Sequence, residues 1–142
     1  IMPSLVGSEM CIRDRYLQDY EEVYDYRNIE VTIDEQGVFK VTMNESLAVA
    51  LLTNLLKNAF VHNIDGGHIR ITVTKNGITF RNSGVEHPLN KEHIFERFYQ
   101  GSKKEGSTGL GLAIADSICR LQHLNIKYYF EQNEHCFEIS QS

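Results

Sequence analysis

The sequence predicts a layered α/β fold, a two-layer sandwich in which helices pack against one sheet. Short segments with alternating apolar and polar residues recur along the chain, as expected of half-buried strands. Two longer segments place their apolar residues at helical spacing. Turn-forming residues separate these segments, and a length of 142 residues is sufficient for one core of ordinary size.

The first elements are expected between residues 16 and 42. Residues 16–26 are acidic and rich in tyrosine, and we expect the end of a helix there. Residues 29–33 and 38–42 both alternate, and Glu35-Gln36-Gly37 lies between them. This pattern predicts two strands joined in a hairpin.

A long helix and a second hairpin follow. Ser46 is a suitable N-cap for the helix, and Asp65-Gly66-Gly67 is expected to end it. Residues 68–74 then alternate strictly, Asn76-Gly77 is a strong hairpin turn, and residues 78–81 form the returning strand.

The last third of the chain begins with a long polar segment. Residues 86–105 are expected to form a loop with a short helix over 91–99, and a loop of this length is usually functional. An apolar helix is expected over 108–121. Residues 126–130 and 136–139 complete the sheet as a strand pair.

The first fifteen residues differ from the rest. Residues 5–15 resemble a translated sequencing-library adapter more than a natural protein start, and they lack the features of a signal peptide. We expect residues 1–15 to be an artefact and disordered, residues 16–142 to form the domain, and the natural upstream part to be missing.

Composition narrows the class of function. A net charge of −5 argues against general nucleic-acid binding, which needs a basic face. No apolar run approaches the length that spans a bilayer. The three cysteines have no metal spacing, and Cys119 and Cys136 are expected to be buried thiols in a reducing compartment. Five histidines (His68, His87, His93, His123, His135) also form no metal pattern and are expected to be surface or packing residues.

A polar row on the long helix is the most informative motif. Asn54, Asn58 and His62 are spaced by four, so they lie along one helix face beside the apolar stripe. Asn is a poor helix former, and its carboxamide supplies both an oxygen acceptor and N–H donors. Such a row suits a hydrated Mg²⁺ held mostly by phosphates. An exposed polar face explains this helix equally well when it is taken alone.

A glycine-spaced turn runs into the second apolar helix. Gly106, Gly109 and Gly111 allow backbone N–H groups to approach a phosphate closely, and the new helix adds unpaired donors and a positive dipole end. Thr108 can cap the helix or donate to a phosphate oxygen. The turn matches neither a Walker loop nor a Rossmann turn. Taken alone, it is more often a simple loop.

Together with two further segments, these motifs resemble the catalytic and ATP-binding domain of sensor histidine kinases, within the GHKL ATPase superfamily. Residues 54–59 resemble its N box, Asn82-Ser83-Gly84 its first glycine box, residues 95–99 its F box, and residues 106–111 its second glycine box. The resemblance implies a Bergerat-type ATP-binding fold, with a mixed, mostly antiparallel sheet and about three helices on one face.

The resemblance also implies roles for individual residues. Asn58 would coordinate Mg²⁺, Asn54 would lie near the metal and phosphates, and His62 would contact the nucleotide. Asn82 stands where the family has an Asp that accepts a hydrogen bond from the adenine amino group; an ordinary strand-end turn is the alternative. Thr108, Gly109, Leu110 and Gly111, with Gly84, would complete the ATP site.

One departure concerns the charges around the phosphates. Val61 stands where the family often has Lys or Arg. Lys103 and Lys104 are candidates to replace that charge, although a solvated basic pair is the alternative.

In the F box, Phe95 and Phe98 are expected to pin the ATP lid to the domain. Arg97 is expected either to reach phosphate or a neighbouring helical domain, or to remain in solvent.

One absence separates branches of the family. Hydrolytic members carry a general-base Glu one turn before the metal-binding Asn, and here that residue is Asn54, which cannot take a proton. We therefore expect phosphoryl donation from ATP·Mg²⁺ to a His on a missing dimeric helical domain, and then to a response regulator receiver domain. The intact protein is expected to be a homodimer, with this domain on the cytoplasmic side. An anti-sigma-type serine kinase and a non-catalytic nucleotide-binding module are the alternatives.

Overall fold

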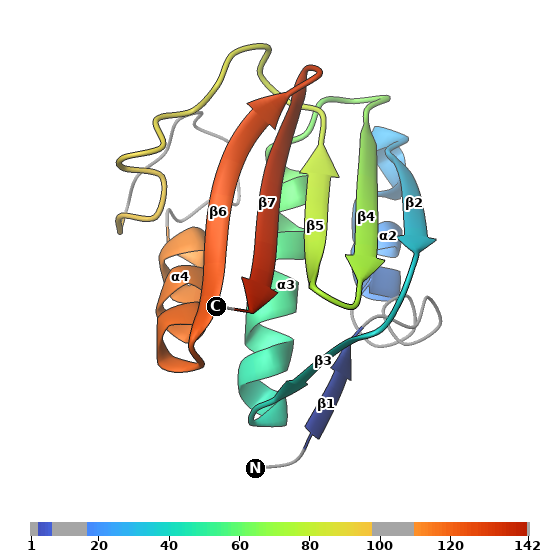
Figure 1. The fold of residues 1–142 in the computed structure, drawn as a ribbon. Coiled ribbons are helices and arrows are strands. Elements are labelled where there is room, and N and C mark those ends of the chain that lie inside the picture. The colour runs from blue at the N-terminus through green and yellow to red at the C-terminus, as the bar shows by residue number, and fades with distance from the viewer. Residues whose placement is uncertain (1–2, 7–16, 98–109, 142) are drawn as a thin grey trace.

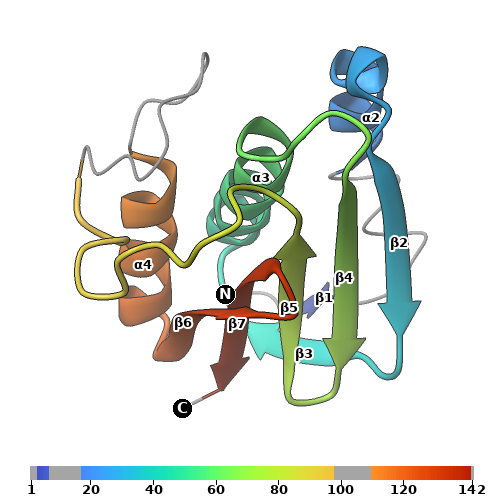
Figure 2. The ribbon, with the colours of Figure 1, turned by 90° about the horizontal axis from the view of Figure 1, so that it is seen from above.

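In the described residues, a five-stranded sheet carries helices on a single face, and a separate two-stranded sheet lies at one end (Figures 1 and 2). The computed structural model describes residues 3–6, 17–97 and 110–141. The five-stranded sheet has the order β2-β4-β5-β7-β6. Its strands are β2 (Glu30–Glu35), β4 (His68–Thr74), β5 (Gly77–Asn82), β6 (Leu124–Glu131) and β7 (Glu134–Gln141). The helices are α2 (Gln18–Val23), α3 (Glu45–Val61) and α4 (Gly111–Leu121), and all lie on the same face.

The strand directions confirm the predicted fold class. β2 pairs with β4 in parallel, and the other neighbours in the sheet are antiparallel. The β4–β5 hairpin turns at the predicted Asn76-Gly77. The β6–β7 hairpin turns at Gln132 and Asn133, whose φ values of 53° and 63° suit the tight turns that match strand twist.

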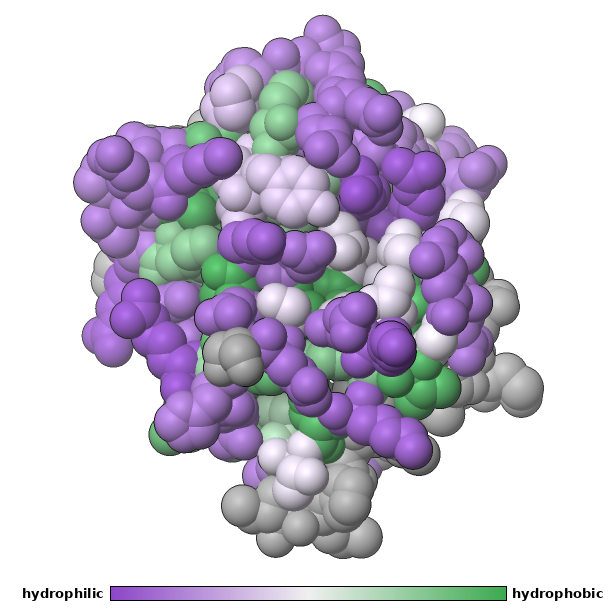
Figure 3. All heavy atoms as spheres, viewed as in Figure 1, coloured by the Kyte–Doolittle hydropathy of each residue, from purple (hydrophilic) through white to green (hydrophobic). Residues whose placement is uncertain are grey.

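The core lies between the sheet and α3. Ile69, Ile71 and Val73 alternate along β4 and are fully buried, as the sequence pattern predicted. The leucines and Phe60 of α3 pack against this face. Tyr20 and Tyr24 stack on Phe60, so they hold α2 and the segment after it against the end of α3. The sheet's other face is uncovered and largely hydrophilic (Figure 3).

The predicted hairpin at residues 35–37 was wrong. β2 pairs with β4, and this pairing continues through the Gln36 N–H, which donates to Val73 O. β3 (Phe39–Thr42) instead pairs with β1 (Pro3–Val6) beneath the sheet. Because β2 and β3 do not pair with each other, β2 can join the edge of the five-stranded sheet. The Phe39 side chain of β3 is buried in the core.

Within residues 1–15 the structure describes only Pro3–Val6, which pairs with β3 along one edge. The rest of this segment lies outside the described residues, and its artefactual origin stays a prediction.

Two predicted helix boundaries also differ. Asn44, not Ser46, caps α3, because its Oδ1 accepts from the Ser46 N–H at 2.8 Å. Residues 91–97 form successive turns anchored on the Asn90 carbonyl in place of the predicted regular helix. The described part of the second apolar helix begins at Gly111. Within the described ranges, none of the helices combines the length and hydropathy needed to cross a bilayer.

Candidate nucleotide-binding site

The polar row occupies the last turns of α3 on the side of the helix that leads towards α4. Asn54, Asn58 and His62 are each half-buried. The Asn54 Nδ2 donates to the Ala50 carbonyl at 2.7 Å, which fixes the carboxamide and leaves Oδ1 directed away from its own helix. His62 is the C-cap of α3, and its N–H donates to the Asn58 carbonyl. The row is therefore held in one register along the helix.

The start of α4 lies against one end of this row. A Cβ atom on Gly111 would come within 3.2 Å of Asn54 Oδ1. Leu110 occupies the N-cap and has no side-chain oxygen for capping. In the sequence, Leu110 and Gly111 directly follow the glycine turn. The helix that begins after the turn therefore starts beside the carboxamide of Asn54.

The end of β5 lies against the other end of the row. A Cβ atom on Gly84 would come within 2.8 Å of the His62 carbonyl oxygen. Only glycine fits this approach without a shift of the backbone. The N box helix therefore touches both glycine-containing segments, Gly111 beside Asn54 and Gly84 beside His62.

Asn82 carries an unusual polar atom. Its side chain is 2% exposed, and its Nδ2 donates to the Ser83 carbonyl at 2.8 Å. Its Oδ1 is buried and has no hydrogen-bond partner among the residues that the structure describes. A buried acceptor left unpaired costs about 1–3 kcal/mol, so such an atom signals a missing donor. An amino group of a bound base is a donor of the required kind.

A buried network that the sequence analysis did not assign joins α3 to the end of β5. The Ser83 hydroxyl donates to Asn63 Oδ1 at 2.5 Å, and the Asn63 Nδ2 donates to the Ala59 and His68 carbonyls at 3.0 Å. Asn63 is fully buried. The network fixes the first glycine box relative to the N box helix.

Arg27 is a second unassigned residue, and it closes the end of α3. Its guanidinium donates to the Phe60 and Asn63 carbonyls at 2.6 Å, and its Nε donates to Asp65 Oδ1 at 2.8 Å. The final carbonyls of a helix lack intrahelical partners and carry partial negative charge, which a guanidinium satisfies. No local pattern around Arg27 indicates this contact, because its partners lie more than thirty residues downstream.

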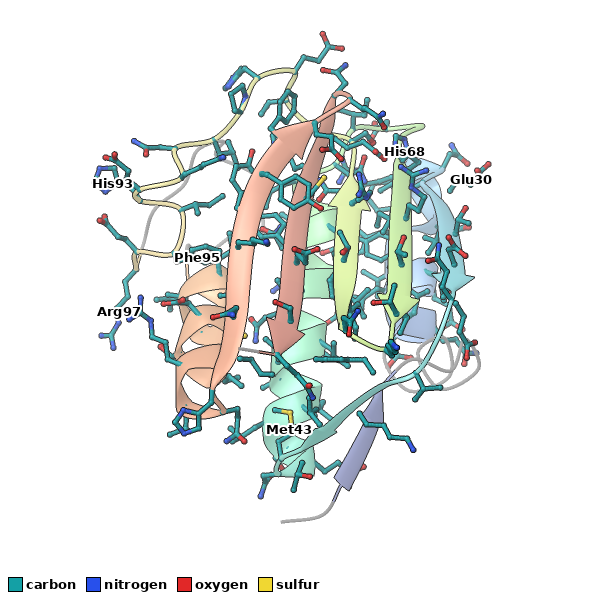
Figure 4. All side chains as sticks on the ribbon, viewed as in Figure 1. Glu30, Met43, His68, His93, Phe95 and Arg97 are labelled. Carbon is teal, nitrogen blue, oxygen red and sulfur yellow. The ribbon has the colours of Figure 1, made fainter. Side chains whose placement is uncertain are left out.

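The remaining predicted residues have mixed outcomes. Lys103, Lys104, Thr108 and Gly109 lie outside the described residues. The side chain of Val61 is 5% exposed and packs inward, so this position offers no charge to a phosphate. The Phe95 ring packs edge-on against the Phe137 ring, with 6.4 Å between the ring centroids, as expected of a residue that pins its segment to the domain. Arg97 is exposed and points away from the sheet (Figure 4).

The opposite end of the molecule holds an open hollow of about 300 Å³. Its walls come from the end of β3, the turn before β6, and Gln141 of β7. None of the predicted site residues contributes to it, and its lining contains no lysine, arginine or glycine segment. The packing of α3 against the two glycine segments is therefore the better guide to the site.

The fold is a two-layer α/β sandwich with a polar row on α3, and comparisons with known proteins identify the family. The model of the histidine kinase-, DNA gyrase B-, and HSP90-like ATPases matches residues 43–140, and the chain belongs to this family. The family implies nucleotide binding.

The relatives and solved structures that resemble the chain include histidine kinases. Sensor histidine kinase RppB of Synechocystis is 44% identical over 84 residues, covering 53% of this chain and 18% of RppB. The catalytic domain of histidine kinase ThkA has a TM-score of 0.78 at 24% identity, covering 98% of this chain and 94% of that one. ThkA in complex with response regulator protein TrrA has a TM-score of 0.71 at 25% identity, covering 99% of this chain and 42% of ThkA. The chain thus matches less than a fifth of the length of RppB.

Proposed function

We propose that this chain is the ATP-binding and phosphoryl-donating domain of a two-component sensor histidine kinase. One observation carries the proposal: α3 contacts both glycine-containing segments along a single polar row, at Asn54 and at His62. The names of the relatives and the matched family model support the same activity.

Each end of the row is suited to a different part of ATP. We propose that Asn82 Oδ1 accepts from the adenine amino group, because it is a buried acceptor that lacks a donor. Gly84 and His62 would lie beside the base and sugar. At the other end, Asn54 and the amides at Leu110 and Gly111 would face the phosphates, together with Thr108, Gly109 and Lys103.

Asn58 lies between these ends and would hold Mg²⁺. Its neutral oxygen suits a hard cation that takes most of its ligands from phosphates and water. When bound, Mg²⁺ neutralises negative charge on the phosphate oxygens during phosphoryl transfer. The protein's own contribution would be to position the nucleotide with fixed amides and backbone donors.

The phosphate acceptor is proposed to be a His on a dimeric helical domain of the intact protein, which would be a homodimer with this domain on the cytoplasmic side. Transfer to a response regulator would follow, and ThkA in complex with TrrA provides the precedent. Asn54 replaces the general base that hydrolysis and serine-kinase chemistry use, which disfavours both.

Nucleotide titration followed by phosphotransfer tests this function. The purified chain is expected to bind ATP·Mg²⁺ with an affinity between micromolar and millimolar, about −8 to −4 kcal/mol. It should not label itself from radiolabelled ATP, and it should label an added His-containing helical domain of a related kinase. Labelling of serine in place of histidine would favour the anti-sigma type, and absence of Mg²⁺-dependent binding would favour a non-catalytic module.

A further inference from the structure

His135 is buried directly beside the proposed adenine end of the site. It lies on β7 in register with Asn82 of β5, and it is 3% exposed. A Cβ atom on Gly84 would come within 3.1 Å of its ring. The chain that leaves β5 therefore passes over the imidazole before it continues into the exposed residues 86–88.

For a neutral imidazole, the hydrogen bonds of His135 have one consistent set of directions. The Val85 carbonyl can only accept, so the His135 Nε2–H donates to it at 2.8 Å. The Leu89 N–H can only donate, and it donates to the Tyr128 hydroxyl oxygen at 2.9 Å. The Tyr128 O–H then donates to His135 Nδ1 at 2.7 Å. A neutral imidazole satisfies every member of this relay.

The relay ties both ends of a five-residue segment to the β6–β7 hairpin. Val85 and Leu89 are anchored through His135 and Tyr128, while residues 86–88 between them are exposed. Tyr128 is 5% exposed, and its ring packs on the Phe137 ring with 5.1 Å between the ring centroids. The Tyr128–His135 hydrogen bond is buried and the two bonds to the segment's backbone are partly buried, so the segment is held at both of its ends where it leaves Asn82.

We propose that His135 and Tyr128 are positioning residues of the nucleotide site, and that their relay fixes residues 85–89 at the adenine end. The inference rests on the proposed function, and it assigns to the β6–β7 hairpin a role in binding that no motif of the family resemblance covers here. Neither side chain needs to touch the nucleotide. Both act through the backbone that follows Asn82.

Tyr128→Phe is the decisive variant, because it removes one hydroxyl and keeps the ring that packs on Phe137. We expect the Leu89 amide to exchange with solvent at least ten-fold faster in this variant, and we expect ATP·Mg²⁺ to bind several-fold more weakly. Tyr129→Phe is the matched control, since Tyr129 lies next in sequence on the uncovered face beside Arg81. In Tyr129→Phe, the Leu89 amide exchange rate and the affinity for ATP·Mg²⁺ should equal those of the unchanged protein.

His135→Gln and His135→Leu form a second pair. A Gln side chain offers a donor and an acceptor at its end and should retain much of the affinity, whereas Leu offers neither and should lose it. A loss of affinity caused only by poor packing would affect Gln and Leu alike.

The outcomes separate this inference from the proposed function. If the unchanged protein binds no ATP, the function fails, while Leu89 exchange in Tyr128→Phe still reports on the relay. If the unchanged protein binds ATP but Tyr128→Phe matches Tyr129→Phe in both affinity and Leu89 exchange, the positioning role is overturned and the function stands.

Discussion

Gly111 lies directly against the carboxamide of Asn54. A methyl group at position 111 would require Asn54 Oδ1 to shift. One residue comes from the N box helix, and the other begins the helix that follows the second glycine box. Two residues that are far apart in sequence therefore lie side by side, one from each motif.

Replacing Gly111 with Ala tests this contact. Ala is the better helix former by about 1 kcal/mol, but its methyl group would press on a carboxamide that Ala50 holds in place. Asn54→Ala removes that carboxamide. We therefore expect the double variant to be about 0.5–1 kcal/mol more stable than the sum of the single effects predicts. Urea unfolding of all four proteins measures the coupling, and strict additivity would show that the two groups do not interact.

Asn58→Ala is expected to weaken Mg²⁺-dependent ATP binding at least ten-fold, or about 1.4 kcal/mol. The reason is the loss of the one amide oxygen assigned to the metal. Folding should be preserved, because Ala suits a helix interior better than Asn. Calorimetric titration with and without Mg²⁺ gives the affinity, and Asn125→Ala on the exposed edge of β6 is the control. Equal Mg²⁺ dependence in both variants would rule out the metal assignment.

Asn82→Ala should reduce discrimination between ATP and GTP. The unpaired Oδ1 matches the amino group of adenine, whereas guanine presents a carbonyl oxygen at the same place, which cannot donate. Stability should change by less than about 1 kcal/mol, because the lost bond to the Ser83 carbonyl is offset by removal of an unsatisfied acceptor. Competition titrations with the two nucleotides provide the measurement. An unchanged preference for ATP would mean that Asn82 does not read the base.

The pKa of His135 is lowered from its ordinary value of 6.5, mainly because burial disfavours the charged imidazole; nearby His87 adds to the effect, and the Val85 carbonyl opposes it. The unfolded chain therefore binds a proton more readily than the folded one. The resulting stability is fully present above about pH 6.5 and is lost as the pH falls through the folded pKa.

Unfolding free energies at pH 7.5 and pH 5 should consequently differ less in His135→Gln than in the unchanged protein. NMR titration of the His135 ring gives the pKa independently of stability. A measured pKa at or above 6.5 would contradict the expected direction.

Arg27→Ala should destabilise the protein by about 2 kcal/mol, because it removes hydrogen bonds from a charged donor to two carbonyls at the end of α3. Arg120→Ala is the control, since the Arg120–Asp116 pair is exposed and worth less than about 0.5 kcal/mol. Urea unfolding compares the two. If both variants lose the same small amount, Arg27 does not hold the helix end.

Local patterns predicted much of the fold. Strict alternation predicted β4, Asn76-Gly77 predicted the hairpin of β4 with β5, and the apolar stripe predicted α3. The hairpin at residues 35–37 failed because its turn signal was local, whereas the parallel pairing of β2 with β4 spans the whole of α3. Long-range pairing of this kind leaves little trace in a short window of sequence.

The candidate site divides in the same way. The polar row and the glycine segments follow from spacing and from the family resemblance. The contributions of Arg27, Tyr128 and His135 do not, because each acts through a contact between segments that are distant in sequence. The isolated histidine in a strand pattern gave no sign of its relay to Val85 and Leu89.

The central claim is that one nucleotide occupies the space beside α3 between the two glycine segments. Mapping amide chemical-shift changes on an isotope-labelled chain during titration with ATP·Mg²⁺ tests it most directly. We expect the amides of Asn54, Asn58, His62, Asn82, Gly84 and Gly111 to shift together along one saturation curve, while residues around Gln141 remain unchanged. Saturable shifts confined to the opposite end of the sheet, or shifts at only one of the two glycine segments, would contradict it.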